Sequence, residues 1–155
     1  MSRFEVTTLV PAPPPVVFDV SLSVDVHTTS FGHTGERAVA GVTSGMLALG
    51  DRVTWRARHF GITWHLTSVI SVCERPSFFV DEQVTGPFRR WHHAHTFEAA
   101  HDGAATLMTD VVDFAAPVPP LGTLADLLVL KRYLRRLILL RNAHIQAVAA
   151  APDQR

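Results

Sequence analysis

The chain has 155 residues, of which 47% are apolar and 18% charged, and 14 acidic side chains balance 14 basic ones. A chain of this length fits one domain, residues 1–155, with a sizeable core. Its neutrality excludes a global field that would attract nucleic acid, so we expect no nucleic-acid partner. Cys73, the single cysteine, cannot form an intramolecular disulfide, and no apolar run reaches the length of a membrane span. We therefore expect a cytoplasmic protein without integral membrane association.

The first part of the chain predicts a strand followed by a short helix. FEVTTLV at residues 4–10 alternates polar and apolar residues, as a half-buried strand does. The prolines of PAPPP suit the first turn of a helix, which we expect from about Pro14 to Ser21. The next segment, VDVHTTSFGHTGER, is compatible with a second short helix or with a loop.

Strand patterns dominate from about Arg37 to Ala116, and a helical pattern follows. The predicted strands are rich in β-branched and aromatic residues and lie at residues 38–44, 52–60, 63–72, 78–84, 89–98 and 106–115. Residues 121–150 then predict one long helix, from the spacing of Leu127, Leu130, Leu134, Leu137, Ile138 and Leu140. Such a helix is about 40 Å long. The order of elements predicts an α+β domain with the helix on one face of an antiparallel sheet.

Two turns fix the register of two predicted hairpins. Phe60-Gly61 as a two-residue loop places Trp55 opposite Leu66 and Ala57 opposite Trp64, so that the apolar faces coincide.

The stronger turn signal is Asp102-Gly103. It pairs strands 89–98 and 106–115 so that the inner face carries Trp91, His93, His95, Phe97, Met108, Asp110, Val112 and Phe114. His92 then points outward beside Asp113.

The histidines of RRWHHAHTFE suggest a site on the inner face. His95 lies directly opposite Asp110, where an imidazole and a carboxylate can form a hydrogen bond. This pair is either a proton-transfer or substrate-orienting site, or a satisfied structural pair. His93 and His95 could also chelate a metal with Asp110 or Glu82. Because the sequence has no HExxH motif and no cysteine ligands, we expect no functional metal and no cofactor.

The strand at residues 78–84 has two possible orientations. Glu82 faces inward if Gly86-Pro87 forms a tight turn, and Asp81 with Gln83 faces inward if the connection differs by one residue. Trp55, Trp64 and Trp91 fall on inner faces and pack a core or line a ligand cavity. A basic cluster in the long helix is assigned to its solvated face, and consists of Lys131, Arg132, Arg135, Arg136 and Arg141.

With these residues placed, the chain resembles the SRPBCC superfamily, which includes START domains, birch-pollen-allergen-like proteins and polyketide cyclases/dehydrases. The resemblance covers nearly the whole chain, from PAPPPVVFD through TDVVDF to LKRYLRRLILLRN. FVDEQVTGPFRRWHHAHTF is similar to one bacterial branch, through Phe79, Asp81, Gln83, Gly86-Pro87-Phe88, Trp91, His93, His95 and Phe97. The segment with His27 and His33 departs from many relatives, and the role of both residues stays open.

The resemblance implies a helix-grip fold, in which a curved antiparallel sheet of about six to seven strands wraps a long C-terminal helix around a hydrophobic cavity. The leading hypothesis is binding of a small lipophilic molecule. The expected ligand-binding residues are Trp55, His59, Trp64, Glu82, Trp91, His93, His95, Phe97, Met108, Asp110, Val112 and Phe114. One alternative is a polyketide cyclase/dehydratase-type enzyme that uses His95 and Asp110 as general acid/base, with His93 as a further candidate. Another is a non-catalytic interaction module with a filled core, and a homodimer through a sheet edge is possible in each case.

Overall fold

A computed structural model describes residues 1–116 and 124–152 of the chain. Its helices are α1 (Pro14–Ser21), α2 (Val24–Ser30) and α3 (Leu124–Ala150), with two short 3₁₀ turns, η1 (Gly32–Thr34) and η2 (His101–Gly103). Its strands are β1 (Ser2–Val10), β2 (Arg37–Gly41), β3 (Arg52–His59), β4 (Ile62–Glu74), β5 (Phe78–Thr85), β6 (Arg90–Ala100) and β7 (Ala105–Ala115). The short helix predicted from Pro14 to Ser21 is confirmed, and the ambiguous segment that follows it holds a second helix.

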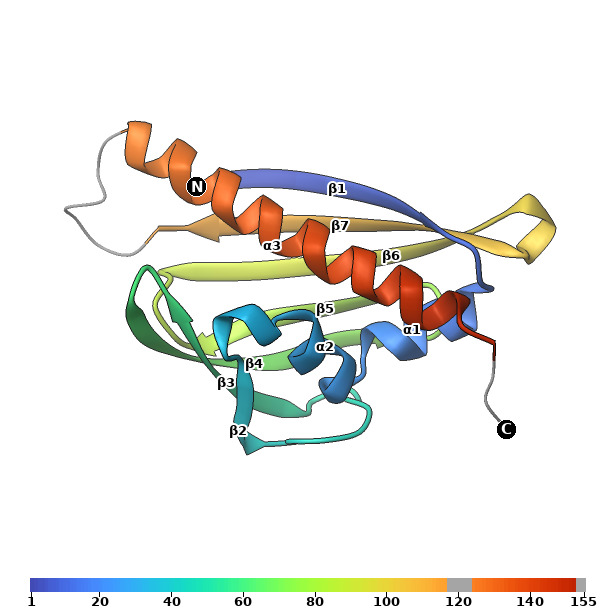
Figure 1. Ribbon diagram of the computed structural model, residues 1–155, viewed down its shortest axis with the longest axis horizontal. Coiled ribbons are helices and arrows are strands. Elements are labelled where there is room, and N and C mark those ends of the chain that lie inside the picture. Colours follow the sequence, from blue (N-terminus) through green and yellow to red (C-terminus); the bar gives the residue numbers. More distant parts are fainter. Residues whose placement is uncertain (117–123, 153–155) are drawn as a thin grey trace.

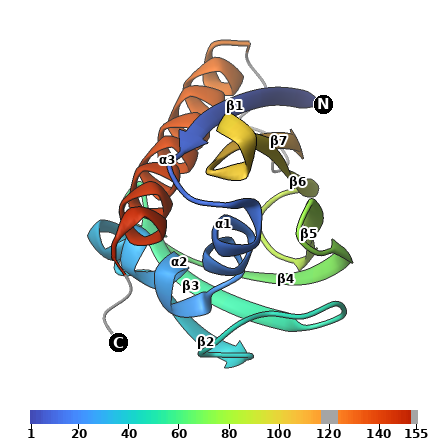
Figure 2. The same ribbon diagram turned by 90° about the vertical axis from the view of Figure 1, so that its right-hand side faces the viewer.

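The strands form one curved antiparallel sheet in the order β1-β7-β6-β5-β4-β3-β2. Figure 1 shows α3 crossing the sheet along its length, and Figure 2 shows the strands curling around one side of that helix. The predicted α+β helix-grip architecture is therefore confirmed. No helix among residues 1–116 and 124–152 has the length and apolar character needed to cross a membrane.

Both predicted hairpin registers are confirmed. In β3 and β4, His59 pairs with Ile62 and Trp55 with Leu66. In β6 and β7, His95 pairs with Asp110. These registers hold because each turn supplies residues in the left-handed conformation that a tight reversal needs, such as Gly61 at φ +73° and Gly103 at φ +83°.

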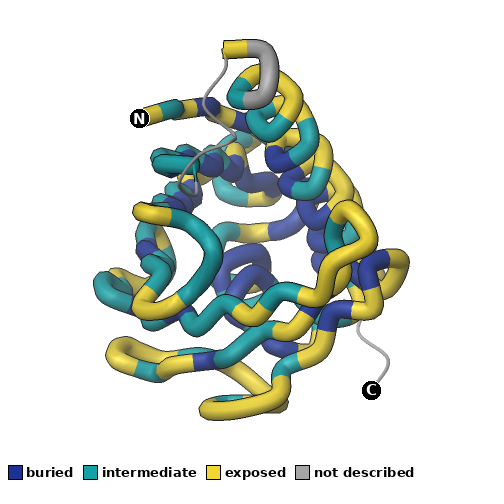
Figure 3. The backbone as a smooth tube through the Cα atoms, turned by 90° about the vertical axis from the view of Figure 1, so that its left-hand side faces the viewer, coloured by how far each residue is buried: buried dark blue, intermediate teal, exposed yellow. Residues whose placement is uncertain are grey.

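Helix α3 is amphipathic in the way the sequence predicts, with one difference. Leu134, Ile138 and Ile145 are buried against the sheet side. Leu140, which the spacing assigned to the apolar stripe, is 41% exposed, because it lies away from the stripe that these three residues define. Figure 3 shows the buried stretches on the inside of the wrapped sheet and the exposed stretches on its outer turns.

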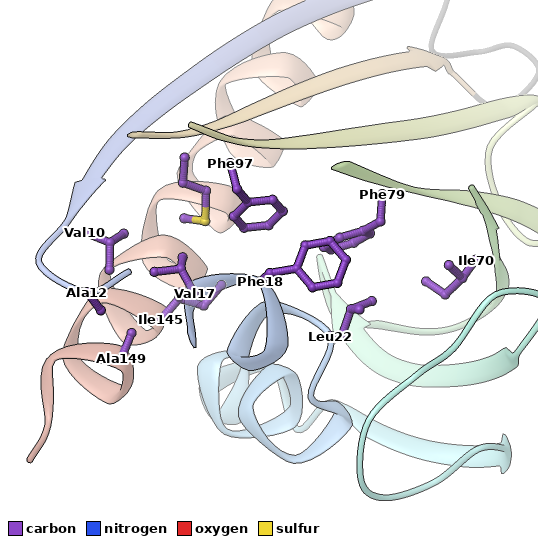
Figure 4. Close-up of a cluster of buried hydrophobic side chains, with 11 residues drawn as sticks. Val10, Ala12, Val17, Phe18, Leu22, Ile70, Phe79, Phe97, Ile145 and Ala149 are labelled. Atoms are coloured by element: carbon purple, nitrogen blue, oxygen red, sulfur yellow. The ribbon is translucent and has the colours of Figure 1, made fainter. Parts of the chain in front are cut away.

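The packed core has two parts. Around α1, the ring of Phe18 meets Phe79 and Phe97 edge-on, with centroids 5.5 and 5.3 Å apart (Figure 4). Along β1 and β7, Phe114 packs with Phe4 under the first half of α3. These two clusters fill the ends of the space between sheet and helix.

Candidate functional site

A cavity of about 260 Å³ lies between α2, α3 and the inner faces of strands β3 to β6. Helix α3 contributes four apolar residues to its wall, Leu130, Leu134, Leu137 and Ile138, together with the polar Tyr133 and Arg141. Six residues that the sequence assigned to the ligand also line it, namely Trp55, His59, Trp64, Trp91, His93 and His95. The interaction-module hypothesis required a filled core, whereas the described residues enclose this cavity.

Other residues assigned to the ligand lie elsewhere. Phe97, Met108, Val112 and Phe114 are at most 3% exposed and pack in the two core clusters rather than among the cavity-lining residues. They face inward as predicted, but α1 and the first half of α3 cover them. Asp110 is fully buried behind the cavity wall, where it contacts the two histidines.

The orientation of β5 resolves the choice between Glu82 and its neighbours. Glu82 pairs with His92 on the outer face, whereas Asp81 pairs with His93 on the inner face and lines the cavity. The tight-turn alternative that placed Glu82 inside is therefore wrong. Strand β6 starts only at Arg90, and the amide of Gln83 bridges the connection by hydrogen bonds to the backbone of Phe88.

Asp110 is the centre of a buried polar network. The His93 Nε2–H donates to Asp110 Oδ1 over 2.9 Å, and Asn142 Nδ2 donates to Oδ2 over 2.6 Å. Arg141 Nη1 lies 3.4 Å from Oδ1. His95 Nδ1 lies 2.9 Å from the same oxygen, but it is not aligned for a hydrogen bond and has no other partner among the described residues. A buried carboxylate with this many donors is held in one position.

Arg141 and Asn142 extend this network from α3, and the sequence reasoning missed both. Arg141 is 4% exposed, so its assignment to a solvated helix face is wrong. Its guanidinium also contacts the backbone carbonyl of Ser21 over 3.4 Å. The spacing contained the signal, because Arg141 lies three residues after Ile138 and four before Ile145, on the buried stripe.

Asp81 and the two inner histidines converge at the cavity wall. His95 Nε2 lies 2.8 Å from Asp81 Oδ2, and His93 Nδ1 lies 3.6 Å from the same oxygen. The imidazole rings are 3.8 Å apart, and the ring of Phe79 stacks on His95 at 4.0 Å. Asp81, His93 and His95 each offer one ligand atom, and the three atoms lie within 4.8 Å of one another, so this cluster has the composition of a metal site.

Burial and charge set the protonation states of the cluster. Burial would raise the pKa of Asp81, but the charge of His93 and the hydrogen bond with His95 outweigh it and lower the pKa to about 2. Burial would likewise raise the pKa of Asp110, but its contacts with His93 and His95 hold it well below the usual range. For His93, burial and the neighbouring His95 lower the pKa to about 4, against the opposing effect of Asp81 and Asp110. At neutral pH the cluster therefore has two carboxylates and a neutral His93.

A second polar group lies where the cavity reaches the surface. The exposed Phe60 lines the cavity there and packs on Tyr133, whose hydroxyl is 2.5 Å from His59 Nδ1. Burial lowers the pKa of His59 and raises that of Tyr133, so both groups are neutral at pH 7. Strand β3 and helix α3 are thus joined by a hydrogen bond across the opening.

Of the two histidines whose role was open, only His27 reaches the cavity. Its Nε2 lies 2.6 Å from Glu36 Oε1, and its ring packs on Trp55 at 4.1 Å. His33 is exposed and contributes to a separate surface depression.

The fold and its cavity define the class of protein as a helix-grip domain. No family model matches the chain, and no curated protein matches its sequence. Solved structures do match. A protein of Thermus thermophilus is similar over 96% of this chain and 100% of its own, at a TM-score of 0.74 and 16% identity.

Two further solved structures share this fold. The Zhui aromatase/cyclase from a Streptomyces species is similar over 96% of this chain and 93% of its own, at a TM-score of 0.71 and 17% identity. A START superfamily protein from Mycobacterium smegmatis is similar over 94% of this chain and 98% of its own, at a TM-score of 0.69 and 11% identity. At these identities the likeness shows the fold, and it confirms the helix-grip architecture that the resemblance implied.

Proposed function

We propose that this protein binds a small lipophilic molecule in the cavity, with an oxygen atom of that molecule directed at Asp81, His93 and His95. This proposal rests on how apolar and ionisable side chains are distributed around the cavity. Apolar side chains form most of the wall. The ionisable groups gather in three places, which are the histidine–aspartate cluster with Arg141, the pair of His27 and Glu36, and the pair of His59 and Tyr133. An apolar wall with a few convergent polar groups is the usual composition of a small-molecule site.

The size of the cavity limits the ligand. Sites for drug-sized molecules typically measure roughly 300–1,000 Å³. A cavity of about 260 Å³ is just below that range. It suits a compact ring-based molecule better than a long acyl chain.

Two measurements test this proposal. Native mass spectrometry of the freshly purified protein, compared with the denatured mass, would show a retained organic adduct. Binding of the fluorescent probe 1-anilinonaphthalene-8-sulfonate would then be measured for the wild type, Ala57→Phe and Ala99→Phe. Ala57 is buried and lines the cavity, whereas Ala99 is an exposed residue of β6. We expect Ala57→Phe to weaken probe binding at least about tenfold, since an apolar ring in the cavity removes the binding volume.

The control should bind the probe as the wild type does. Equal binding by the wild type and Ala57→Phe would place the probe on the surface and contradict the proposal. A wild type that binds no probe and carries no adduct would also contradict it.

A second candidate function is catalysis of the cyclase/dehydratase type. It is favoured by the position of His95, which lines the cavity at hydrogen-bonding distance from one carboxylate and 2.9 Å from another. In this role, His95 would transfer a proton to or from an enolisable carbonyl, with Asp110 fixing the orientation of the ring. Helix-grip folds host carriers as well as enzymes, so only turnover decides. Conversion of a poly-β-keto thioester by the wild type, and its loss in His95→Gln with the fold retained, would establish the activity. Equal conversion by both proteins would refute the role of His95.

A further inference from the structure

Asp110 fixes the tautomer of His93. Its Oδ1 accepts an aligned hydrogen bond over 2.9 Å from His93 Nε2, and an ionised carboxylate can only accept. His93 Nε2 is therefore protonated, and His93 Nδ1 carries a lone pair. The second contact of Asp110, with His95 Nδ1, is 2.9 Å long but not aligned, and the His95 ring forms its hydrogen bond through Nε2 with Asp81.

This arrangement places a lone pair and a carboxylate side by side. His93 Nδ1 is 3.6 Å from Asp81 Oδ2, and His95 Nε2 forms a hydrogen bond of 2.8 Å with that oxygen. The proton between His95 and Asp81 does not reach His93 Nδ1. A metal ion in place of that proton would contact all three atoms.

We propose that Asp81, His93 and His95 bind one divalent transition-metal ion, of which zinc is the expected type. Two imidazoles and one carboxylate are a common ligand set for zinc and its neighbours. Ligand atoms at about 2.1 Å from such an ion are roughly 2.9–3.4 Å apart. The distances of 2.8 and 3.6 Å from Asp81 Oδ2 bracket that separation, and the three ligand atoms all lie within 4.8 Å of one another, so side-chain movements would bring them to one ion.

Asp110 completes the site as a positioning residue. Metal-bound histidines almost always donate their second N–H to a carboxylate or carbonyl, which fixes the ring and raises its basicity. Here one carboxylate meets both rings, and Asn142 anchors its other oxygen over 2.6 Å. Three protein ligands, all from residues that line the cavity, leave a coordination position open toward it.

The charges indicate the chemical class of the ligand, and this step rests on the proposed function. Asp81 and Asp110 with the buried Arg141 leave this cluster one negative charge when its histidines are neutral. A divalent ion reverses that sign, so the open position favours an anionic oxygen. A compact lipophilic molecule with a carboxylate or enolate group fits both the apolar wall and the ion.

The test uses tag-free protein dialysed against a chelator and titrated with Co²⁺, whose visible absorption reports the coordination. Affinity for Zn²⁺ follows from competition with a chromophoric chelator. We expect one equivalent of Co²⁺ and an absorption spectrum typical of nitrogen and oxygen ligands. Asp81→Asn should abolish tight binding, and Asp110→Asn should weaken it about 10–100-fold. Glu82→Gln, the adjacent carboxylate on the outer face, should bind as the wild type does.

Two results would overturn the site. One is a wild type that binds no Co²⁺ or Zn²⁺ in the absence of chelator. The other is equal loss in Asp81→Asn and Glu82→Gln, with circular dichroism showing both folded. Because Asp81 is partly accessible, Asp81→Asn is expected to fold even if Asp110→Asn does not. Probe binding in the metal-free protein separates this inference from the proposed function. Probe binding without metal binding refutes only the metal site, and metal binding without probe binding refutes only the lipophilic ligand.

Discussion

Replacing Asp110 with alanine should destabilise the protein far more than the equivalent change on the outer face of the same strand. The Asp110 carboxylate is fully buried and accepts hydrogen bonds from His93 and Asn142, with Arg141 3.4 Å away. Removing it leaves the buried Arg141 guanidinium without an ionised partner and takes the acceptor from His93 Nε2 and Asn142 Nδ2. Breaking a buried ion pair by deleting one partner costs about 3–5 kcal/mol, and a buried unsatisfied donor about 1–3 kcal/mol.

The expected loss for Asp110→Ala is therefore about 3–5 kcal/mol, or about 6–20 °C in Tm for a chain of this size. Asp113→Ala is the matched control, because Asp113 faces solvent on β7 and its partner Arg3 is exposed and 3.8 Å away. An exposed pair of this kind contributes about 0–1 kcal/mol. Urea unfolding of metal-free protein, followed by circular dichroism, measures both. The reasoning is refuted if Asp110→Ala loses less than about 1 kcal/mol, or no more than the control.

Three further predictions concern acid, the cavity opening and the edge of the sheet. In chelator-treated protein the free energy of unfolding should fall by a few kcal/mol as the pH drops below about 6.5. The folded protein holds the pKa of His93 at about 4, so His93 takes up a proton in the unfolded chain at a higher pH than in the folded one, and acid therefore favours unfolding. The lowered pKa of Asp81 (about 2) continues the loss below about pH 3.8, and unchanged stability between pH 7 and 4.5 would contradict this. Tyr133→Phe removes the hydrogen bond across the opening. It should speed probe association and release severalfold in stopped-flow measurements. Rates equal to those of the wild type would show that the opening lies elsewhere. Gly41→Ala should cost at least about 1–2 kcal/mol, because Gly41 has φ +72° and an added Cβ would lie 2.2 Å from a backbone oxygen of β3. Gly45→Ala shares the positive φ without that contact, and an equal loss there would assign the whole effect to the backbone angle.

Much of the candidate site followed from two turns in the sequence. Asp102-Gly103 alone was enough to place His95 opposite Asp110 and to turn His92 outward, because a tight hairpin fixes every pair along its two strands. Phe60-Gly61 did the same for the two tryptophans on β3 and β4. These predictions succeeded because the information lies within a few residues of the reversal.

Asp81 shows where such local information ends. Between β5 and β6 the chain has no tight turn, and a hydrogen-bonded side chain rather than a turn type shapes the connection. The choice between Asp81 and Glu82 depended on a single residue of register, and both orientations of β5 carry alternating apolar residues. Only pairing with His93 across the sheet decided it.

The sequence by itself determined most of the elements, the two hairpin registers, the inner position of His93 and His95, and the resemblance to a helix-grip superfamily, but it left α2 open between a helix and a loop. Only the tertiary structure decided how the inner face is divided between core and cavity. Phe97 and Trp91 occupy the same face of β6, yet α1 covers the first, whereas the second lines the open space. The burial of Arg141 is decided in the same way, by the contact of α3 with a carboxylate distant in sequence. Periodicity and turn chemistry act along the chain, whereas the division of a face depends on which distant element packs against it.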